Sequence, residues 1–341
     1  MGRRQKDPAP GSWVVEVRKR AVPLSMAAGA ALFVAAGLDV VHRHQSASDE
    51  KYAAAKPAAK SESTPPRFVV GVRKAGDGLV VRDVREGEDV GLAVAAPAGR
   101  RFHQVAPAKG GSYVVASYAS RTVEFQRLRL EKSGRPKALE NLPKATVPGI
   151  STSFSDLAVS PDGDRIAYVT YRGNAGRIDV VSTSTGTRKV WTAASPAHIN
   201  SLSWAGDTLA FVWHPLRMVA GKVTEVRHQV RTLDTKGQGG DLKMSKAVLT
   251  LPKGGTTAVL ARDGRTLVAG IVQNGQLSLQ AFTVATGRPA NALWKQKVSG
   301  SVTRLGTDRT GRHFLATASD GRLHAQDVPP VTGVDLADAA W

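Results

Sequence analysis

One segment of the sequence places an aromatic residue beside groups that bind anions and sugars. Trp213 and His214 are followed closely by Arg217, and Arg227 lies further along the same segment. A tryptophan ring can stack on a ligand, while histidine and arginine side chains donate hydrogen bonds to its oxygen atoms. We therefore treat Trp213, His214, Arg217 and Arg227 as candidate residues for binding a ligand or a partner.

A structural explanation of the same segment stays open. In a strand over residues 224–232, the side chains at alternate positions would share one face. These positions are occupied by Glu225, Arg227, Gln229 and Arg231. Glu225 and Arg227 would then form an ion pair that keeps an outer strand soluble, and Trp213 would pack against a neighbouring part of the protein.

Basic residues are concentrated between residues 100 and 137, where Arg101, Arg127 and Arg129 are candidate contacts for an anionic partner. The whole chain carries a net charge of +19, which favours anionic surroundings. Nucleic-acid binding would need aromatic side chains between the charges, and only Phe102 and Phe125 lie near them, so we expect no nucleic acid. The remaining choices are an anionic component of the cell envelope, a protein partner, or a solvated basic rim.

No pattern in the sequence indicates catalysis. The chain has no cysteine, which excludes disulfides, thiolate metal sites and cysteine nucleophiles. The G-x-S-x-G, H-E-x-x-H, P-loop and G-x-G-x-x-G motifs are also missing. His42 and His44 have the spacing of a metal pair, but solvated histidines explain them better. We therefore predict no catalytic residues, no cofactor and no metal site.

The candidate residues belong to a chain of short apolar runs separated by turns. Between residues 155 and 191, four such runs end in Pro161-Asp162-Gly163, Asn174-Ala175-Gly176 and Thr185-Gly186-Thr187. These are the residue types that tight turns require, and short strands divided by them predict an all-β fold. Equivalent turns recur about every 45–50 residues, the spacing of the four-stranded blades of a β-propeller.

The second run of each unit supports this architecture, because it is apolar on both faces, as in residues 166–169 and 209–212. A blade packed between two neighbours buries both of its faces. The first and last units have three runs each, and residues 334–341 resemble a first strand such as residues 156–159. If this tail completes the first unit, the chain forms six blades in a closed ring; five or seven blades remain open.

A family resemblance rests on the best-formed unit. Ser160-Pro161-Asp162-Gly163, then Ile166-Ala167-Tyr168, Ile178-Asp179-Val180-Val181 and Thr185-Gly186 resemble the repeat of TolB-like and related WD-type propellers. The match is partial at Arg262-Asp263-Gly264 and at Asp308-Arg309-Thr310-Gly311. The resemblance implies the propeller fold and says little about activity, because propellers have many unrelated functions.

The part of the chain before the repeats has a different composition. Residues 1–20 are a basic tail, and residues 21–38 contain no charged residue. We expect residues 21–41 to be a transmembrane signal anchor, with the basic cluster Arg18-Lys19-Arg20 on the cytoplasmic side. A cleaved signal peptide and a buried soluble helix are the alternatives. Residues 42–66 are a flexible linker, and residues 67–341 are the propeller.

These observations predict a membrane-anchored β-propeller of the cell envelope. Its N-terminus would be cytoplasmic, and the propeller would lie outside the cytoplasm and bind a partner without catalysis. One alternative is a hydrolase or lyase with a site in the central channel or on the loop face. Such an enzyme should bring polar side chains from several first strands together, with a histidine or carboxylate near a nucleophile. The other alternative is a cytoplasmic scaffold propeller.

Overall fold

The short apolar runs form strands throughout residues 64–326 and 328–341, which are the residues described by the computed structural model. The predicted basic tail and signal anchor, and most of the predicted linker, lie outside these residues. The only helical segments in the described part are two short 3-10 turns, η1 (Lys109–Gly111) and η2 (Leu242–Met244). Among the described residues, no helix has the length and apolar character needed to cross a membrane.

The main strands form six antiparallel blades, numbered here in chain order. Blade one contains β26 (Leu336–Ala340), β1 (Phe68–Arg73), β2 (Gly78–Asp83) and β3 (Val94–Ala95). Blade two contains β4 (Arg101–Pro107), β5 (Ser112–Ala119), β6 (Thr122–Leu130) and β7 (Pro136–Pro148). Blade three contains β8 (Leu157–Val159), β9 (Arg165–Arg172), β10 (Ala175–Ser182) and β11 (Arg188–Thr192).

The second half of the chain repeats this plan. Blade four contains β12 (Ala197–Ala205), β13 (Thr208–Val219), β15 (Gln229–Asp234) and β17 (Lys246–Thr250). Two short strands come from the same part of the chain: β14 (Lys222–Glu225) pairs with β13, and β16 (Gly240–Asp241) pairs with β11 of blade three. Blade five contains β18 (Gly255–Leu260), β19 (Thr266–Gln273), β20 (Gln276–Thr283) and β21 (Pro289–Lys297). Blade six contains β22 (Val302–Thr307), β23 (Phe314–Ala318), β24 (Arg322–Ala325) and β25 (Val328–Thr332).

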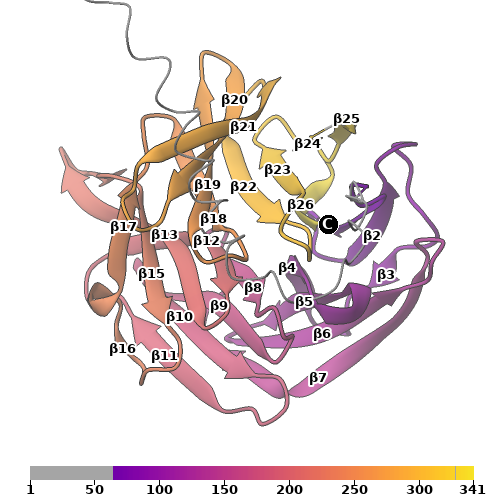
Figure 1. Ribbon diagram of the computed structural model, residues 1–341. Helices are drawn as coiled ribbons and strands as arrows, with labels where there is room; N and C mark the ends of the chain where they lie inside the picture. Colours follow the sequence, from indigo (N-terminus) through magenta and orange to yellow (C-terminus); the bar gives the residue numbers. More distant parts are fainter. Residues whose placement is uncertain (1–63, 327) are drawn as a thin grey trace, which may run out of the picture. The chain divides into compact units, whose positions relative to one another are not determined.

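The blades are arranged as a ring, and β4, β8, β12, β18, β22 and β26 lie nearest its centre (Figure 1). Six clusters of buried apolar side chains hold the ring together, and each cluster combines residues from two successive blades. In one of them, Leu315 and Leu323 of blade six pack with Val69 and Leu336 of blade one. The predicted propeller fold is confirmed, because each blade buries both faces against its neighbours.

The last strand closes the ring. β26 pairs antiparallel with β1, with Val70 opposite Ala340 and Gly71 opposite Ala339. Leu336 is 6% exposed and Trp341 is 4% exposed, so both side chains are buried at the junction. Gly71 leaves room for Leu336, because a Cβ at this position would lie 2.7 Å from a leucine methyl group. The prediction that residues 334–341 supply the missing first strand is confirmed, and it gives six blades.

One predicted strand differs from the observed ones. The single strand predicted over residues 224–232 is wrong, because the chain forms β14, leaves the strand conformation, and then forms β15. The cause is the length of β13, which pairs with β14 near its end and with β15 along its first half.

Candidate functional site

An arginine from blade six separates two chambers at the centre of the ring. Arg304, on the inner strand β22, lines both chambers, and so does Asp156, which directly precedes β8. The Arg304 guanidinium lies 2.5 Å from Asp338 Oδ1 and 3.1 Å from Asp156 Oδ1. It also donates to Gln104 of blade two. One side chain therefore links four blades across the channel.

The two aspartates also fix the contacts between neighbouring blades. Asp156 Oδ2 accepts a hydrogen bond of 2.8 Å from the backbone N–H of Leu202, on the inner strand of blade four. Asp338 Oδ2 accepts one of 2.7 Å from the backbone N–H of Val105, on the inner strand of blade two. The aspartates thus occupy equivalent places in blades three and one, and Arg304 forms an ion pair with each of them.

Burial dominates the electrostatics of this network. It raises the pKa of the Asp338 carboxyl, although Arg304 acts in the opposite direction. Burial, with a further contribution from Arg304, lowers the pKa of nearby His103 to about 4. His103 is therefore neutral at pH 7, and its Nδ1 lies 3.5 Å from the hydroxyl of Tyr168.

The first chamber, of about 330 Å³, contains a cluster of three histidines around one carboxylate. Glu225 Oε1 lies 3.0 Å from His198 Nδ1, and Glu225 Oε2 lies 2.9 Å from His228 Nε2. His214 Nδ1 is 3.4 Å from the same Oε2 atom, without hydrogen-bond geometry. His198 stacks on Phe154 with a centroid distance of 3.6 Å. We name His198, His214, Glu225 and His228 the His–Glu cluster.

A local irregularity of blade four assembles this cluster. Leu216 of β13 is opposite Glu225, and Trp213 of β13 is opposite Gln229. Two residues of β13 therefore face three residues of the partner chain, which is the extra residue of a β-bulge. Strict alternation would put Glu225 and His228 on opposite faces, and the extra residue brings both side chains against His214.

The groups of the cluster perturb one another. The imidazoles of His214, His228 and His198 hold the pKa of Glu225 far below its usual range. Glu225 raises the pKa of His228, whereas burial lowers the pKa of His214. The carboxylate is thus ionised throughout the neutral pH range, and the two neighbouring histidines have opposite tendencies to bind a proton.

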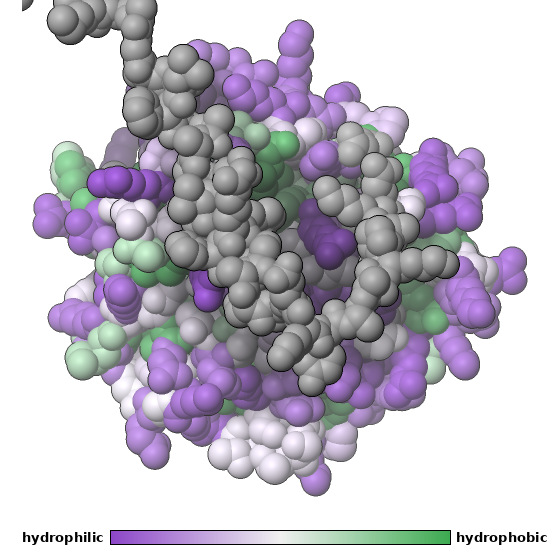
Figure 2. All heavy atoms as spheres, in the orientation of Figure 1, coloured by the Kyte–Doolittle hydropathy of each residue, from purple (hydrophilic) through white to green (hydrophobic). Residues whose placement is uncertain are grey.

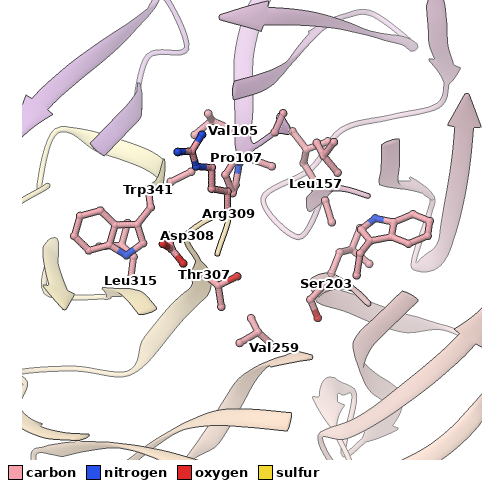
Figure 3. Close-up of a pocket in the computed structure, with 18 of the residues that line it drawn as sticks. Val105, Pro107, Leu157, Ser203, Val259, Thr307, Asp308, Arg309, Leu315 and Trp341 are labelled. Carbon is pink, nitrogen blue, oxygen red and sulfur yellow. The ribbon is translucent and has the colours of Figure 1, made fainter. Parts of the chain in front are cut away.

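The second chamber, of about 230 Å³, lies on the other side of Arg304. Residues at the ends of the inner strands line it. Figure 3 shows Trp341 and Ser203 on opposite sides of this chamber, with Asp308 and Arg309 between them. Its charged lining residues besides Arg304, Asp156 and Asp308 are Lys109, Arg262 and Arg309. These three cations have no ion-pair partner within the described residues. We name this space the basic chamber.

Two indole rings line the basic chamber. They belong to Trp204 and Trp341, and the Nε1 atom of each is buried without an acceptor within the described part of the chain. The Arg165 guanidinium lies 4.9 Å from the Trp204 ring centroid and holds that ring from its other side. Asp308, the remaining acid of this chamber, is occupied by His313, at 3.0 Å. Positive charges therefore prevail here.

The predicted binding residues of blade four are only partly brought together. Trp213 is 8% exposed and packs in the core between blades three and four, so it is not available for stacking. His214 lines the first chamber, as a member of the His–Glu cluster. Arg217 and Arg227 are exposed and line neither chamber. Glu225 pairs with histidines, and the expected ion pair between Glu225 and Arg227 is not formed.

The basic residues of blade two do not converge on a site. Arg101 is exposed at the start of β4, and Arg129 forms an exposed pair with Glu140 at 3.3 Å. Arg127 is partly buried and its Nε has no acceptor within the described residues. On the face drawn in Figure 2, hydrophilic side chains are spread around the periphery of the ring. Arg101, Arg127 and Arg129 therefore line neither chamber.

Sequence reasoning missed the residues that meet at the channel. Polar side chains from several inner strands do converge there, as expected for a propeller enzyme. In the first chamber, however, no serine or threonine hydroxyl among the described residues is hydrogen-bonded to a histidine or carboxylate. The available signal was the polar residue that interrupts each apolar first strand, as Asp156, Arg304 and Asp338 do.

Comparisons with known proteins identify the fold alone. No family model and no curated protein matches the sequence. Among solved structures, a functionally unknown protein from Desulfotomaculum acetoxidans is similar, with a TM-score of 0.51, 12% identity, and 80% of this chain and 96% of that chain covered. TolB from Acinetobacter baumannii is similar with a TM-score of 0.50, 14% identity, and coverage of 80% of this chain and 65% of TolB. The TolB-like propeller fold is thereby supported.

Proposed function

We propose that this protein is a binding module that accepts an anionic group of a cell-envelope component in the basic chamber. The observation that carries the proposal is the set of three cations, Lys109, Arg262 and Arg309, around a cavity of about 230 Å³. Cations without a counter-ion at the mouth of a cavity attract and orient anions. The proposal extends the predicted preference for an anionic partner and moves it from blade two to the channel.

The chamber offers complementary chemistry for a carboxylate or phosphate group. Arg262 and Arg309 can each donate two parallel hydrogen bonds to such a group. Lys109 adds a third positive charge to the same lining. The cavity volume limits the bound part to a small ligand or to one acidic group of a larger molecule.

Isothermal titration calorimetry of the full-length protein with inorganic phosphate and with citrate tests this proposal. We expect one bound anion per chain at low ionic strength, weakened by added salt. The double variant Arg262→Ala/Arg309→Ala should bind at least about tenfold more weakly. The control Arg85→Ala/Arg288→Ala removes the same charge from two exposed sites outside the chamber and should bind normally. Equal loss in both variants would reject the chamber as the site.

We further propose that residues 21–41 anchor the protein in the cell membrane, with the propeller outside the cytoplasm. The support is the uncharged run behind Arg18-Lys19-Arg20 in the sequence. Protease added to intact cells should degrade the propeller and leave the N-terminal tail protected. Full protection of the propeller in intact cells, with digestion after lysis, would instead favour a cytoplasmic scaffold.

A further inference from the structure

The hydrogen bonds of the His–Glu cluster determine which nitrogen of His228 carries the proton. His228 Nδ1 lies 2.8 Å from the carbonyl oxygen of Gly255, and a carbonyl can only accept, so Nδ1 carries the proton. A neutral imidazole has one N–H and one lone pair. A neutral His228 therefore has its lone pair on Nε2, which lies 2.9 Å from Glu225 Oε2.

His214 repeats the arrangement from the neighbouring strand. Its Nε2 lies 3.1 Å from Asn200 Oδ1 and donates to it, so a neutral His214 also has its lone pair on the inner atom, Nδ1. That atom lies 3.4 Å from Glu225 Oε2 and is buried without a hydrogen bond within the described residues. Three electron-pair donors from two imidazoles and one carboxylate thus face one point.

We propose that a divalent first-row transition metal ion, of which zinc is the reference case, binds His214 Nδ1, His228 Nε2 and Glu225 Oε2. The three ligand atoms lie within 4.8 Å of one another. A tetrahedral zinc ion with bonds of about 2.0–2.1 Å separates neighbouring ligand atoms by about 3.3 Å. The separations of 2.9 and 3.4 Å from the carboxylate oxygen to the two nitrogens already approach that value.

Each ligand is oriented by a partner behind it, as metal ligands in proteins usually are. Gly255 holds His228, Asn200 holds His214, and His198 holds the second oxygen of Glu225 at 3.0 Å. His198 is in turn fixed by its stacking on Phe154. The bulge between β14 and β15 thus produces a preorganised set of two histidines and one carboxylate.

The ligand types select the class of metal and leave room for a further ligand. Imidazole nitrogen combined with one carboxylate suits zinc, iron, cobalt and nickel, whereas calcium and magnesium prefer oxygen ligands alone. Three protein ligands leave at least one coordination position, and the cluster lines a chamber of about 330 Å³. An oxygen or nitrogen donor from solvent or from a ligand can occupy that position. This proposal departs from the sequence prediction of no metal site, and it does not depend on the function proposed for the basic chamber.

Metal content and affinity of the full-length protein test the proposal. The protein is stripped with a chelator, and zinc binding is measured by calorimetry; cobalt is then added to record its visible absorption, which reports the ligand field. We expect one tightly bound ion per chain. The variants Glu225→Gln and His228→Ala should lose more than about 100-fold in affinity, and His198→Ala should lose about 10–100-fold, as positioning residues do.

Two controls separate this site from other histidines. His313→Ala disrupts a histidine–carboxylate pair in blade six that has a single imidazole, and it should bind zinc normally. His42→Ala/His44→Ala tests the histidine pair near the N-terminus and should also leave the affinity unchanged. Circular dichroism of each variant without metal establishes that it is folded. The proposal would be overturned if the wild type took up no zinc, or if folded Glu225→Gln and His228→Ala still took it up. If the wild type took up no zinc, protons on the histidines alone would compensate the charge of Glu225.

Discussion

Replacing Arg304 with methionine is the most direct test of the network that separates the two chambers. The variant Arg304→Met keeps much of the apolar volume and removes the group that contacts Asp156 and Asp338. The side chains of these aspartates are 7% and 1% exposed, so the guanidinium, and not bulk water, compensates their charge. Removing one partner of a buried ion pair costs about 3–5 kcal/mol, because the other charge stays buried. For a unit of about 280 residues, with an unfolding entropy of about 2.1 cal/mol/K per residue, this loss lowers Tm by about 5–9 °C.

The destabilisation should depend on pH. Burial already raises the pKa of Asp338 while Arg304 opposes it, so removing Arg304 raises that pKa further. The folded-state pKa then lies above the unfolded value of about 3.9. As the pH falls through the folded pKa, Asp338 takes up a proton and the buried charge disappears. The stability deficit of the variant is therefore complete at about pH 8 and smaller at about pH 5.

Urea unfolding followed by tryptophan fluorescence at these two pH values measures the effect. Arg312→Met is the matched control, because Arg312 is exposed on the same blade and its side chain has no ion-pair partner within the described residues. The triple variant Arg304→Met/Asp156→Asn/Asp338→Asn leaves no charge buried and should recover most of the lost stability. A wild-type Tm for Arg304→Met, or a deficit that is identical at both pH values, would refute this account of the network.

One further prediction concerns closure of the ring, and another concerns how the stability of the protein depends on the protonation of His103. Truncation after Gly333 removes β26 and exposes the edge of β1. The burial of Leu336 and of Trp341 is worth about 1.5–3 kcal/mol each, so we expect Tm to fall by about 5–10 °C. We also expect the truncated protein to aggregate through the exposed edge of β1. A wild-type melting curve and no aggregation by light scattering would contradict this. His103 has a folded pKa of about 4, below its unfolded value of about 6.5, so its contribution to stability is lost as the pH falls from about 6.5 to about 4. Between about pH 7 and pH 5 it should cost about 2 kcal/mol, and unfolding of His103→Gln should lack this part of the pH dependence.

The sequence was sufficient for the architecture because blade packing depends on local patterns. Turn residues such as Pro161-Asp162-Gly163 mark where each strand ends, and apolar runs on both faces show that a strand is buried between two others. The closing strand was also predictable, because residues 334–341 resemble the first strand of blade three. In the structure Asp338 lies beside Arg304 as Asp156 does, and Asp335 pairs with Arg82.

The candidate site was less predictable because it depends on register and on contacts between distant blades. One extra residue in the segment between Glu225 and Gln229 reverses the alternation on which the prediction relied, and so moves Glu225 toward His214. The Arg304 network joins residues of blades six, three and one, whose distances along the chain carry no signal in a single sequence. The sequence left the place of Trp213 open, because a tryptophan in a long hairpin can face either the solvent or the core, and in the structure it packs in the core.

The order in which the strands appear has a consequence for biosynthesis. Blades two to five can each form as soon as their own residues are available, but blade one lacks its inner strand until residues 336–340 have been made. Its contact between Val70 and Ala340 joins positions about 270 residues apart, and such distant pairings slow folding. The growing chain therefore exposes an unpaired edge of β1 until β26 has been made, and a chain that stops before β26 cannot complete its ring.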